Sequence, residues 1–231
     1  MPNERRIPTA VLRRGILSSV VFFVVLFAAL FLPAGDIRWA KGWLFIVALL
    51  GLMVPAVAYL WRVNPDIFIA RSKIHEGTKG WDKVLMSILL LSHMAEYPVA
   101  AFDDGRFHWS NAPWWVVVLG YVLLCLGFLV IAWVEKVNKF AEPGVRIHAE
   151  QKVIDTGPYA IVRHPMYVGA IPYFAGTALA LGSYWALIPA AIAALILVPR
   201  TIMEDKSLHE ELEGYKEYAA RVRCRLIPGI W

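Results

Sequence analysis

Residues 165–199 read PMYVGAIPYFAGTALALGSYWALIPAAIAALILVP, and these 35 positions contain no charged residue and no His. One continuous helix of this length would extend about 52 Å, far beyond the hydrocarbon core of about 30 Å of a membrane. Gly182-Ser183-Tyr184-Trp185 lies at the midpoint and has the composition of a turn. The stretch therefore predicts two short membrane helices joined by a tight turn, in which Pro172 and Pro189 are tolerated as kinks. The small residues expected to let these two arms pack closely are Gly169, Ala175, Gly176, Ala178, Ala180 and Gly182.

Four further apolar runs precede this hairpin, at residues 15–35, 42–61, 84–102 and 109–134. Each is close to the length of about 20 residues that crosses a bilayer as a helix. Hydrophobic residues make up 59% of the 231-residue chain and charged residues 18%, which excludes an ordinary soluble domain with about 25% charged residues. The sequence predicts an all-α integral membrane protein with about six transmembrane helices, the last two forming a tight helical hairpin. We expect an N-terminal four-helix membrane region, residues 1–135, and a cofactor-binding catalytic region, residues 136–231.

Lysine and arginine residues are distributed unevenly between the predicted loops. With the N-terminus placed inside, 20 of them fall on the inner side and three, Arg38, Lys41 and Arg106, on the outer side. Cytoplasmic loops of membrane proteins carry such an excess. We therefore expect a multi-pass protein of the cell membrane with both termini and the active site in the cytoplasm. The basic residues of 62–83 would meet anionic membrane lipids, whereas their wide spacing argues against binding of nucleic acid.

The longest polar stretch, residues 138–167, lies between two predicted spans. Within it, Arg163-His164-Pro165 leads directly into the hairpin, and Pro165 suits the first turn of a helix, where its missing N–H costs nothing. Arg163 can be interpreted as a topology anchor and His164 as a helix cap. A basic residue and a histidine at a helix N-terminus can also hold an anion. Both interpretations stay open at this stage.

Arg200 and Glu204 stand at i and i+4 where the last apolar run ends, so they share one helix face. Such a pair is often an exposed ion pair that contributes only about 0.3–0.5 kcal/mol. Arg200 ends a long apolar helix, however, where a charge tends to face protein or a polar cavity. Apolar residues continue at helical spacing and predict a C-terminal amphipathic cytosolic helix, docked on the protein or on the membrane surface: Leu208, Leu212, Tyr215, Ala219 and Val222.

His93 and Glu96 interrupt the third apolar run and lie at i and i+3 on one helix face. Ionisable groups inside a membrane are functional candidates, so both are candidate substrate-binding residues. The alternative explanation is a hydrogen bond between helices. No metal site is predicted, because a His-x-x-Glu pair alone is too common and the chain has only two cysteines, Cys125 and Cys224.

The polar segments also carry a set of motifs in a fixed order. They are Thr156-Gly157-Pro158-Tyr159, Arg163-His164-Pro165-Met166-Tyr167-Val168-Gly169, Arg200-x-x-x-Glu204 followed by Asp205, Tyr215-x-x-Tyr218 and Arg225-Leu226-Ile227-Pro228. In order and spacing these motifs resemble the isoprenylcysteine carboxyl methyltransferase family. That family belongs to a wider group of membrane methyltransferases, which includes phospholipid N-methyltransferases and thiol methyltransferases. The resemblance covers residues 138–231.

The resemblance implies S-adenosyl-L-methionine as the methyl donor, bound from the cytosol, and a lipophilic or lipidated acceptor that enters from the bilayer. Glu204 would bind the polar end of the donor, and Arg200 would face the acceptor. Asp205 departs from the family, which usually has a second Glu at this position, and the shorter side chain leaves its contact open. The residues that the resemblance assigns to the donor site are Lys152, Val153, Ile154, Tyr159, His164, Pro165, Met166, Tyr167 and Glu204.

The chemistry of the acceptor decides which catalytic groups are needed. A carboxylate needs no general base, since its pKa is about 4, and the planar fork of Arg200 would orient it. A thiol or an amine would need a base, for which His93, His164 and Glu96 are the candidates. We therefore expect a membrane methyltransferase acting on a lipophilic carboxylate of the prenylcysteine type, with Arg200 and Glu204 catalytic. The alternatives are a thiol or phospholipid-amine methyltransferase, an NADPH-dependent membrane reductase and a non-catalytic membrane protein.

Overall fold

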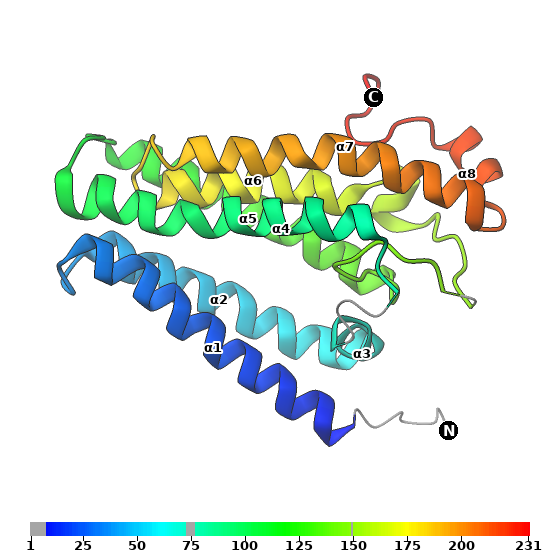
Figure 1. Cartoon of the computed structure of the whole chain (residues 1–231), viewed down its shortest axis with the longest axis horizontal. Helices are drawn as coiled ribbons and strands as arrows, with labels where there is room; N and C mark the ends of the chain where they lie inside the picture. Colours follow the sequence, from blue (N-terminus) through cyan, green and yellow to red (C-terminus); the bar gives the residue numbers. More distant parts are fainter. Residues whose placement is uncertain (1–7, 73–76, 149) are drawn as a thin grey trace.

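The computed structural model describes residues 8–72, 77–148 and 150–231. Over these ranges the regular structure is helical throughout, and six long helices run back and forth between two ends of the molecule (Figure 1). The long helices are α1 (Thr9–Ala34), α2 (Ala40–Val63), α4 (Gly80–Ala100), α5 (Trp114–Val137), α6 (Pro165–Ala180) and α7 (Leu187–Glu211). A π-helical segment, η1 (Ala101–Phe107), extends α4, and three short helices lie in the loops: α3 (Asp66–Ser72), the 3-10 helix η2 (Gly157–Ala160) and α8 (Tyr215–Arg221).

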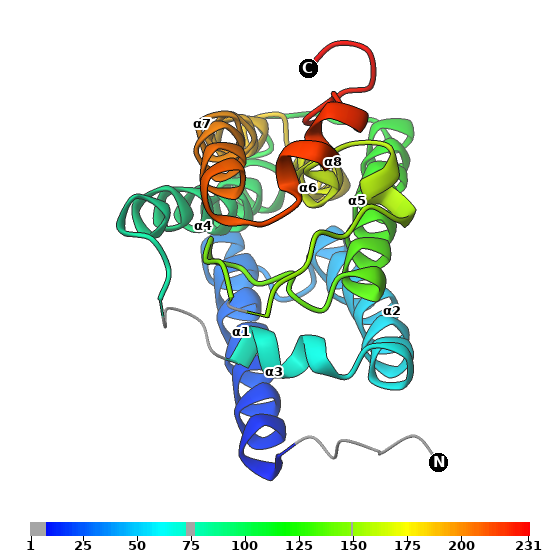
Figure 2. The same cartoon turned by 90° about the vertical axis from the view of Figure 1, so that its right-hand side faces the viewer.

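Five helices are long and apolar enough to cross a membrane: α1, α2, α4 together with η1, α5 and α7. The sixth, α6, has 16 residues and is only about 24 Å long. It lies inside the bundle, where it packs against α5 and α7 (Figure 2). The prediction of an all-α integral membrane protein is confirmed. The turn predicted at residues 182–185 is also present, between α6 and α7.

Glycines at seven-residue spacing bring α5 and α6 into direct backbone contact. A Cβ atom added at Gly120 would lie 2.2 Å from the backbone N of Ala180, and one added at Gly176 would lie 2.4 Å from the backbone N of Leu124. A Cβ atom at Gly127 would lie 2.5 Å from a backbone oxygen of α6. The small residues of α6 were predicted to let it pack against α7, but several of them bring α6 close to α5. The hydropathy pattern alone does not distinguish these two contacts.

Hydrogen bonds connect the turns between helices at the end of the bundle where η1 lies. The fully buried carboxylate of Asp103 accepts hydrogen bonds from the hydroxyl groups of Ser110 (2.6 Å) and Ser183 (2.5 Å). The neighbouring Asp104 accepts bonds from the Trp39 indole (2.9 Å) and the Lys41 ammonium (2.5 Å). These contacts join the α1–α2, η1–α5 and α6–α7 connections. The long polar segments gather at the opposite end (Figure 1).

The C-terminal amphipathic helix is present but interrupted. α7 continues to Glu211, and the chain then turns at Gly214, whose φ of 78° is typical of a left-handed turn. After this turn α8 begins, and Tyr215 and Tyr218 are buried against Val153 and Tyr159 of the polar stretch 138–167. The tail is therefore docked on the protein rather than on the membrane surface.

The basic segment 62–83 contains one element that was not predicted, α3, whose Ile67 is buried against α5. Arg71 in this helix pairs with Glu135 at 2.7 Å. Lys73 and His75, which belong to the predicted lipid-facing set, lie outside the described residues.

Candidate active site at the polar end of the bundle

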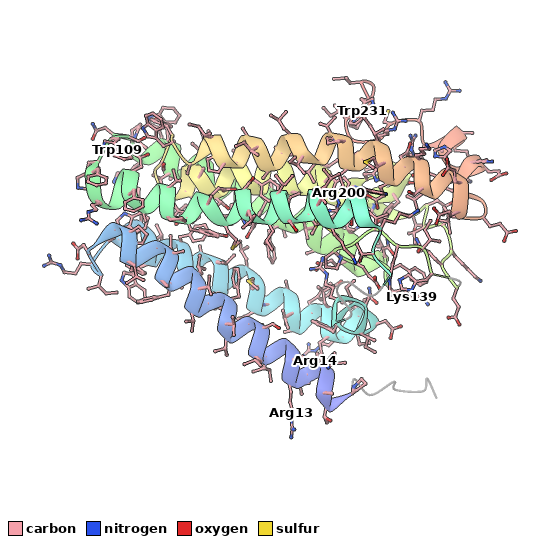
Figure 3. The ribbon with its side chains drawn as sticks, in the orientation of Figure 1. Arg13, Arg14, Trp109, Lys139, Arg200 and Trp231 are labelled. Carbon is pink, nitrogen blue, oxygen red and sulfur yellow. The ribbon has the colours of Figure 1, made fainter. Side chains whose placement is uncertain are left out.

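A cavity of about 310 Å³ opens where α4, α6 and α7 meet the polar segment 138–154 and the C-terminal tail. Its volume is at the lower end of the range of about 300–1,000 Å³ for small-molecule sites. Arg200 lines it, and Figure 3 shows this residue inside the bundle near the end that also carries Lys139 and Trp231. Every residue predicted for the donor site also lines the cavity: Lys152, Val153, Ile154, Tyr159, His164, Pro165, Met166, Tyr167 and Glu204.

The Glu204 carboxylate is held by two residues from the start of α6. The Tyr167 hydroxyl donates a hydrogen bond to Glu204, and the His164 Nδ1 atom lies 3.5 Å from its Oε2 atom. The rings of His164 and Tyr167 are parallel, with centroids 5.7 Å apart. The Glu204 side chain is 23% exposed, so the carboxylate is oriented by protein but still reachable from the cavity. It can bind a positively charged group there.

Arg200 pairs with Asp82 and not with Glu204. Arg200 Nε lies 2.8 Å from Asp82 Oδ1, and Arg200 Nη2 lies 3.3 Å from Asp82 Oδ2. Asp82 is fully buried in the first turn of α4 and also accepts a hydrogen bond of 2.6 Å from the backbone N–H of Val145. The exposed i,i+4 ion pair considered from the sequence is therefore absent among the described residues. Sequence reasoning missed Asp82, whose one local signal is an acidic residue at the start of an apolar run.

Two further contacts fix the plane of the Arg200 guanidinium. Its Nη2 atom donates a hydrogen bond to the backbone oxygen of Pro143, and its Cζ atom lies 5.3 Å from the centre of the Tyr167 ring. The Nε edge of the fork is occupied by Asp82, an arrangement that the sequence did not indicate. Nη1 has no hydrogen-bond acceptor among the residues that the structure describes, and it is not sealed from solvent.

Asp205, next to Glu204, is the centre of a buried polar network. It is 2% exposed and accepts bonds from Arg163 (2.8 and 3.0 Å), Tyr215 (2.9 Å) and Arg225 (2.9 Å). The His164 Nε2 atom lies 3.3 Å from it. The shorter Asp side chain thus ties the start of α6 and the tail to α7. Arg163 is buried in this network and is not an exposed topology anchor.

The network changes the pKa of its members outside the membrane helices. Burial disfavours the charged imidazole of His164, but its bonds to Asp205 and Glu204 outweigh burial and raise the pKa above the ordinary value. Burial, together with the negative charge of Asp205, raises the pKa of the Tyr215 hydroxyl. Burial raises the pKa of Tyr159 to about 12, so this hydroxyl stays protonated and accepts a bond from Asn138.

The inner part of the cavity is apolar. Leu89 of α4, Ala170 and Phe174 of α6 and Leu197 of α7 line it. All four belong to helices that pack within the bundle, so this wall is continuous with the membrane-spanning part of the protein. The cavity therefore combines a polar end, at Glu204, with an apolar end suited to a hydrocarbon group.

His93 and Glu96 lie outside the cavity wall. His93 Nδ1 lies 2.9 Å from Glu96 Oε1, and His93 Nε2 lies 3.0 Å from the Tyr97 hydroxyl, so these contacts fall within α4 rather than between helices. Glu96 is fully buried, and its Oε2 atom has no hydrogen-bond partner in the described structure. The His93 ring contacts Phe174, which does line the cavity, with ring centroids 5.0 Å apart. The structure thus separates this pair from the cavity by one side chain.

Comparison with known proteins agrees with this arrangement. Residues 115–213, which include all of α5 but its first residue, the polar segment, α6 and α7, match the family model described as phospholipid methyltransferase. The chain is 26% identical over 205 residues to two rice proteins named "probable protein-S-isoprenylcysteine O-methyltransferase", one from Oryza sativa subsp. indica and one from subsp. japonica. Each alignment covers 81% of this chain and 96% of the relative. The resemblance inferred from the motifs is confirmed.

Proposed function

We propose that this chain, a multi-pass membrane protein similar to isoprenylcysteine and phospholipid methyltransferases, transfers a methyl group from S-adenosyl-L-methionine to a lipophilic carboxylate. The observation that carries the proposal is that one cavity joins the oriented Glu204 carboxylate, the Arg200 guanidinium and an apolar inner wall. A charged donor needs a polar site and a hydrocarbon-bearing acceptor needs an apolar one, and methyl transfer requires the two sites to be adjacent.

The residues at the polar end fit the donor. Glu204 would bind its ammonium group, because the carboxylate faces the cavity and is held by Tyr167 and His164. Tyr159 also lines the cavity, and the face of an aromatic ring attracts cations. When bound, S-adenosyl-L-methionine supplies a methyl group that is already activated on a positively charged sulfur.

The acceptor side fits a carboxylate. Methylation forms a bond between carbon and the carboxylate oxygen and breaks the bond between carbon and sulfur, whose electron pair stays on sulfur. No proton moves, so no general base is required at neutral pH, where a carboxylic acid of pKa about 4 is ionised. The N–H groups on Arg200 Nη1 would bind the acceptor oxygen and align it, and such alignment is the main contribution a protein makes to this reaction.

A phospholipid amine is the second candidate acceptor, favoured by the match of residues 115–213 to the phospholipid methyltransferase family. An amine must lose a proton before it attacks a methyl group, so a general base is needed. His164, which lines the cavity beside Glu204, is the candidate for this base. The raised pKa of His164 favours its protonated form, which cannot act as a base. This favours the carboxylate over the amine.

The same contacts indicate how the two regions of the chain contribute to the site. Residues 136–231 would form the cofactor-binding region, but α4 of residues 1–135 supplies Leu89 to the cavity and Asp82 to Arg200. The N-terminal region is therefore part of the acceptor site in this proposal. The cavity would open to the cytosol, which accords with the excess of basic residues at this end of the bundle.

Thermal unfolding of the purified protein in detergent tests the donor class. A ligand that binds only the folded protein raises stability by RT ln(1 + [L]/Kd), so S-adenosyl-L-methionine and S-adenosylhomocysteine should raise Tm while NADPH should not. Stabilisation by NADPH alone would point to a reductase, and no response to any of the three would point to a non-catalytic protein.

Methyl transfer with labelled S-adenosyl-L-methionine then tests the acceptor. N-acetyl-S-farnesyl-cysteine should be methylated, whereas farnesyl thiol and phosphatidylethanolamine vesicles should not be. Methylation of phosphatidylethanolamine in place of the carboxylate would replace the proposed acceptor with the amine and leave the donor class intact.

A further inference from the structure

We propose that Asp82 is a positioning residue for the acceptor, because it holds the Arg200 guanidinium through Nε and Nη2 and leaves Nη1 for the acceptor. The inference rests on the proposed methyl transfer to a carboxylate. It assigns a role to a residue that no motif of the sequence indicates and that lies outside the cavity wall.

The geometry leaves the guanidinium one free side. Its Nε–H and one Nη2–H bond Asp82, the other Nη2–H bonds the Pro143 carbonyl, and one face rests on the Tyr167 ring. The two N–H groups on Nη1 have no acceptor among the described residues. Because Arg200 lines the cavity, these two groups are the ones that can meet an acceptor oxygen.

Asp82 is built to stay in place when an acceptor binds. Its side chain is fully buried, and its two oxygens together accept bonds from Arg200 and from the Val145 N–H. An acceptor that displaced Asp82 from Arg200 would leave a buried carboxylate without its counter-charge, which is strongly unfavourable. Asp82 therefore orients Arg200 and does not compete with the acceptor for it.

The same pair also holds the cap loop, which we define as residues 138–148. Pro143 bonds Arg200, Val145 bonds Asp82, and the backbone N–H of Lys79 bonds the Val145 oxygen. A substitution at Asp82 could thus act through the loop instead of through Arg200. The test must separate these two routes.

A double-mutant cycle in the full-length protein separates them. The variants are Asp82→Asn, Arg200→Lys and the double variant, assayed with S-adenosyl-L-methionine and N-acetyl-S-farnesyl-cysteine. The matched control is Asp103→Asn, which removes the charge of an equally buried acid in η1, the segment that extends α4 at its far end, bonded to Ser110 and Ser183. Affinity for S-adenosylhomocysteine is measured by titration calorimetry on each variant.

If Asp82 acts through Arg200, Asp82→Asn lowers kcat/KM for the acceptor by about tenfold or more, as small misalignments do. S-adenosylhomocysteine affinity and the activity of Asp103→Asn remain near wild type. The double variant is then no worse than Arg200→Lys alone, because the two residues act as one unit. Losses that multiply in the double variant, or normal turnover of Asp82→Asn, overturn the proposal.

A variant that does not fold is recognised by loss of both S-adenosylhomocysteine binding and a cooperative thermal transition. In that case Asp82→Glu is tested in place of Asp82→Asn. This variant keeps the negative charge, but its side chain is longer by one methylene and displaces the guanidinium. Normal turnover of Asp82→Glu overturns the proposal. A wild-type protein that binds S-adenosylhomocysteine but transfers no methyl group to the probe instead refutes the proposed acceptor, and the role of Asp82 toward it falls with it.

Discussion

Arg200 of α7 and Asp82 of α4, 118 positions apart in sequence, form a buried two-point ion pair with distances of 2.8 and 3.3 Å. The pair lies beside the cavity and also bonds the backbone of the cap loop through Pro143 and Val145. A buried charge is tolerated where its partner and remaining hydrogen bonds are supplied, as they are here. The polar loop and the membrane-spanning helices are therefore joined at Arg200, the residue to which we assign acceptor binding.

Glu204 should be required for donor binding more than for folding. We expect Glu204→Ala to weaken S-adenosylhomocysteine binding by at least about tenfold, or 1.4 kcal/mol, because it removes the oriented carboxylate of the cavity. Titration calorimetry measures this directly. The control is Glu210→Ala, which removes an exposed acid of the same helix, paired with Lys206 at 3.9 Å, and should leave affinity unchanged. Unchanged affinity in Glu204→Ala would refute the donor-site assignment.

The helices could be predicted because their signal is local. An apolar run without charges indicates a membrane helix wherever it stands, and residues 165–199 indicated a hairpin because they are too long for one crossing. The break between α7 and α8 also had a local signal in the sequence, Gly214, which adopts a left-handed conformation just beyond the end of α7. The even spacing of apolar residues on both sides obscured this break.

The partners of the site residues could not be predicted in the same way. Arg200 was expected to face an acceptor, but no pattern indicated its partner, because the pairing with Asp82 joins two helices distant in sequence and leaves no periodic signal. The sequence left the contact of Asp205 open, and in the structure it accepts hydrogen bonds from Arg163, Tyr215 and Arg225. Such contacts depend on how the helices pack, which composition and spacing do not determine.

Asp205 should be essential for stability. It is buried among three bonded partners and His164, so Asp205→Ala leaves Arg163 as an uncompensated buried charge. We expect a loss of about 3 kcal/mol or more in the free energy of unfolding, measured by denaturant titration in mixed micelles. Asp155→Asn removes an exposed ion pair with Arg221 and should cost less than about 1 kcal/mol. Equal, small losses for the two variants would show that the network contributes little.

The His164 imidazole should make stability depend on pH. Its pKa is raised in the folded protein by Asp205 and Glu204, so its stabilising contribution is complete below its unfolded pKa of about 6.5. The contribution is lost as the pH rises through the higher folded value, as the imidazole gives up its proton. Tm should therefore fall as the pH rises above about 6.5 in the wild type and fall less in His164→Gln. An identical pH profile in wild type and His164→Gln would contradict the prediction.

Cysteine labelling of intact cells tests the orientation of the cavity. In a background without Cys125 and Cys224, we expect an impermeant maleimide to label Arg38→Cys but not His148→Cys in the polar segment. Arg38 belongs to the connection between α1 and α2, which lies at the end of the bundle opposite the polar segments (Figure 1). The excess of basic residues at the cavity end predicts that this end is cytoplasmic. After permeabilisation both positions should react. Labelling of His148→Cys in intact cells would place the cavity outside the cell.

Arg200→Lys separates a residue that anchors topology from one that aligns an acceptor. Lysine keeps the positive charge and can still pair with Asp82 through one bond, so the variant should fold and bind S-adenosylhomocysteine like the wild type. It loses the planar contact with Tyr167 and the N–H groups on Nη1, so kcat/KM for N-acetyl-S-farnesyl-cysteine should fall by about 100-fold. Arg221→Lys, at an exposed surface pair with Asp155, is the matched control and should be fully active.

The pattern of loss in Arg200→Lys also reports on the acceptor. Near-normal turnover would reduce Arg200 to a topology anchor, and a parallel loss of S-adenosylhomocysteine affinity would move it to the donor side of the cavity. A neutral thiol or amine offers the guanidinium no anion to bind. If the wild type methylates such an acceptor and Arg200→Lys methylates it equally well, the carboxylate is not the group that Arg200 evolved to hold. A loss confined to the carboxylate acceptor, with donor affinity intact, is the outcome that the Asp82–Arg200 geometry predicts.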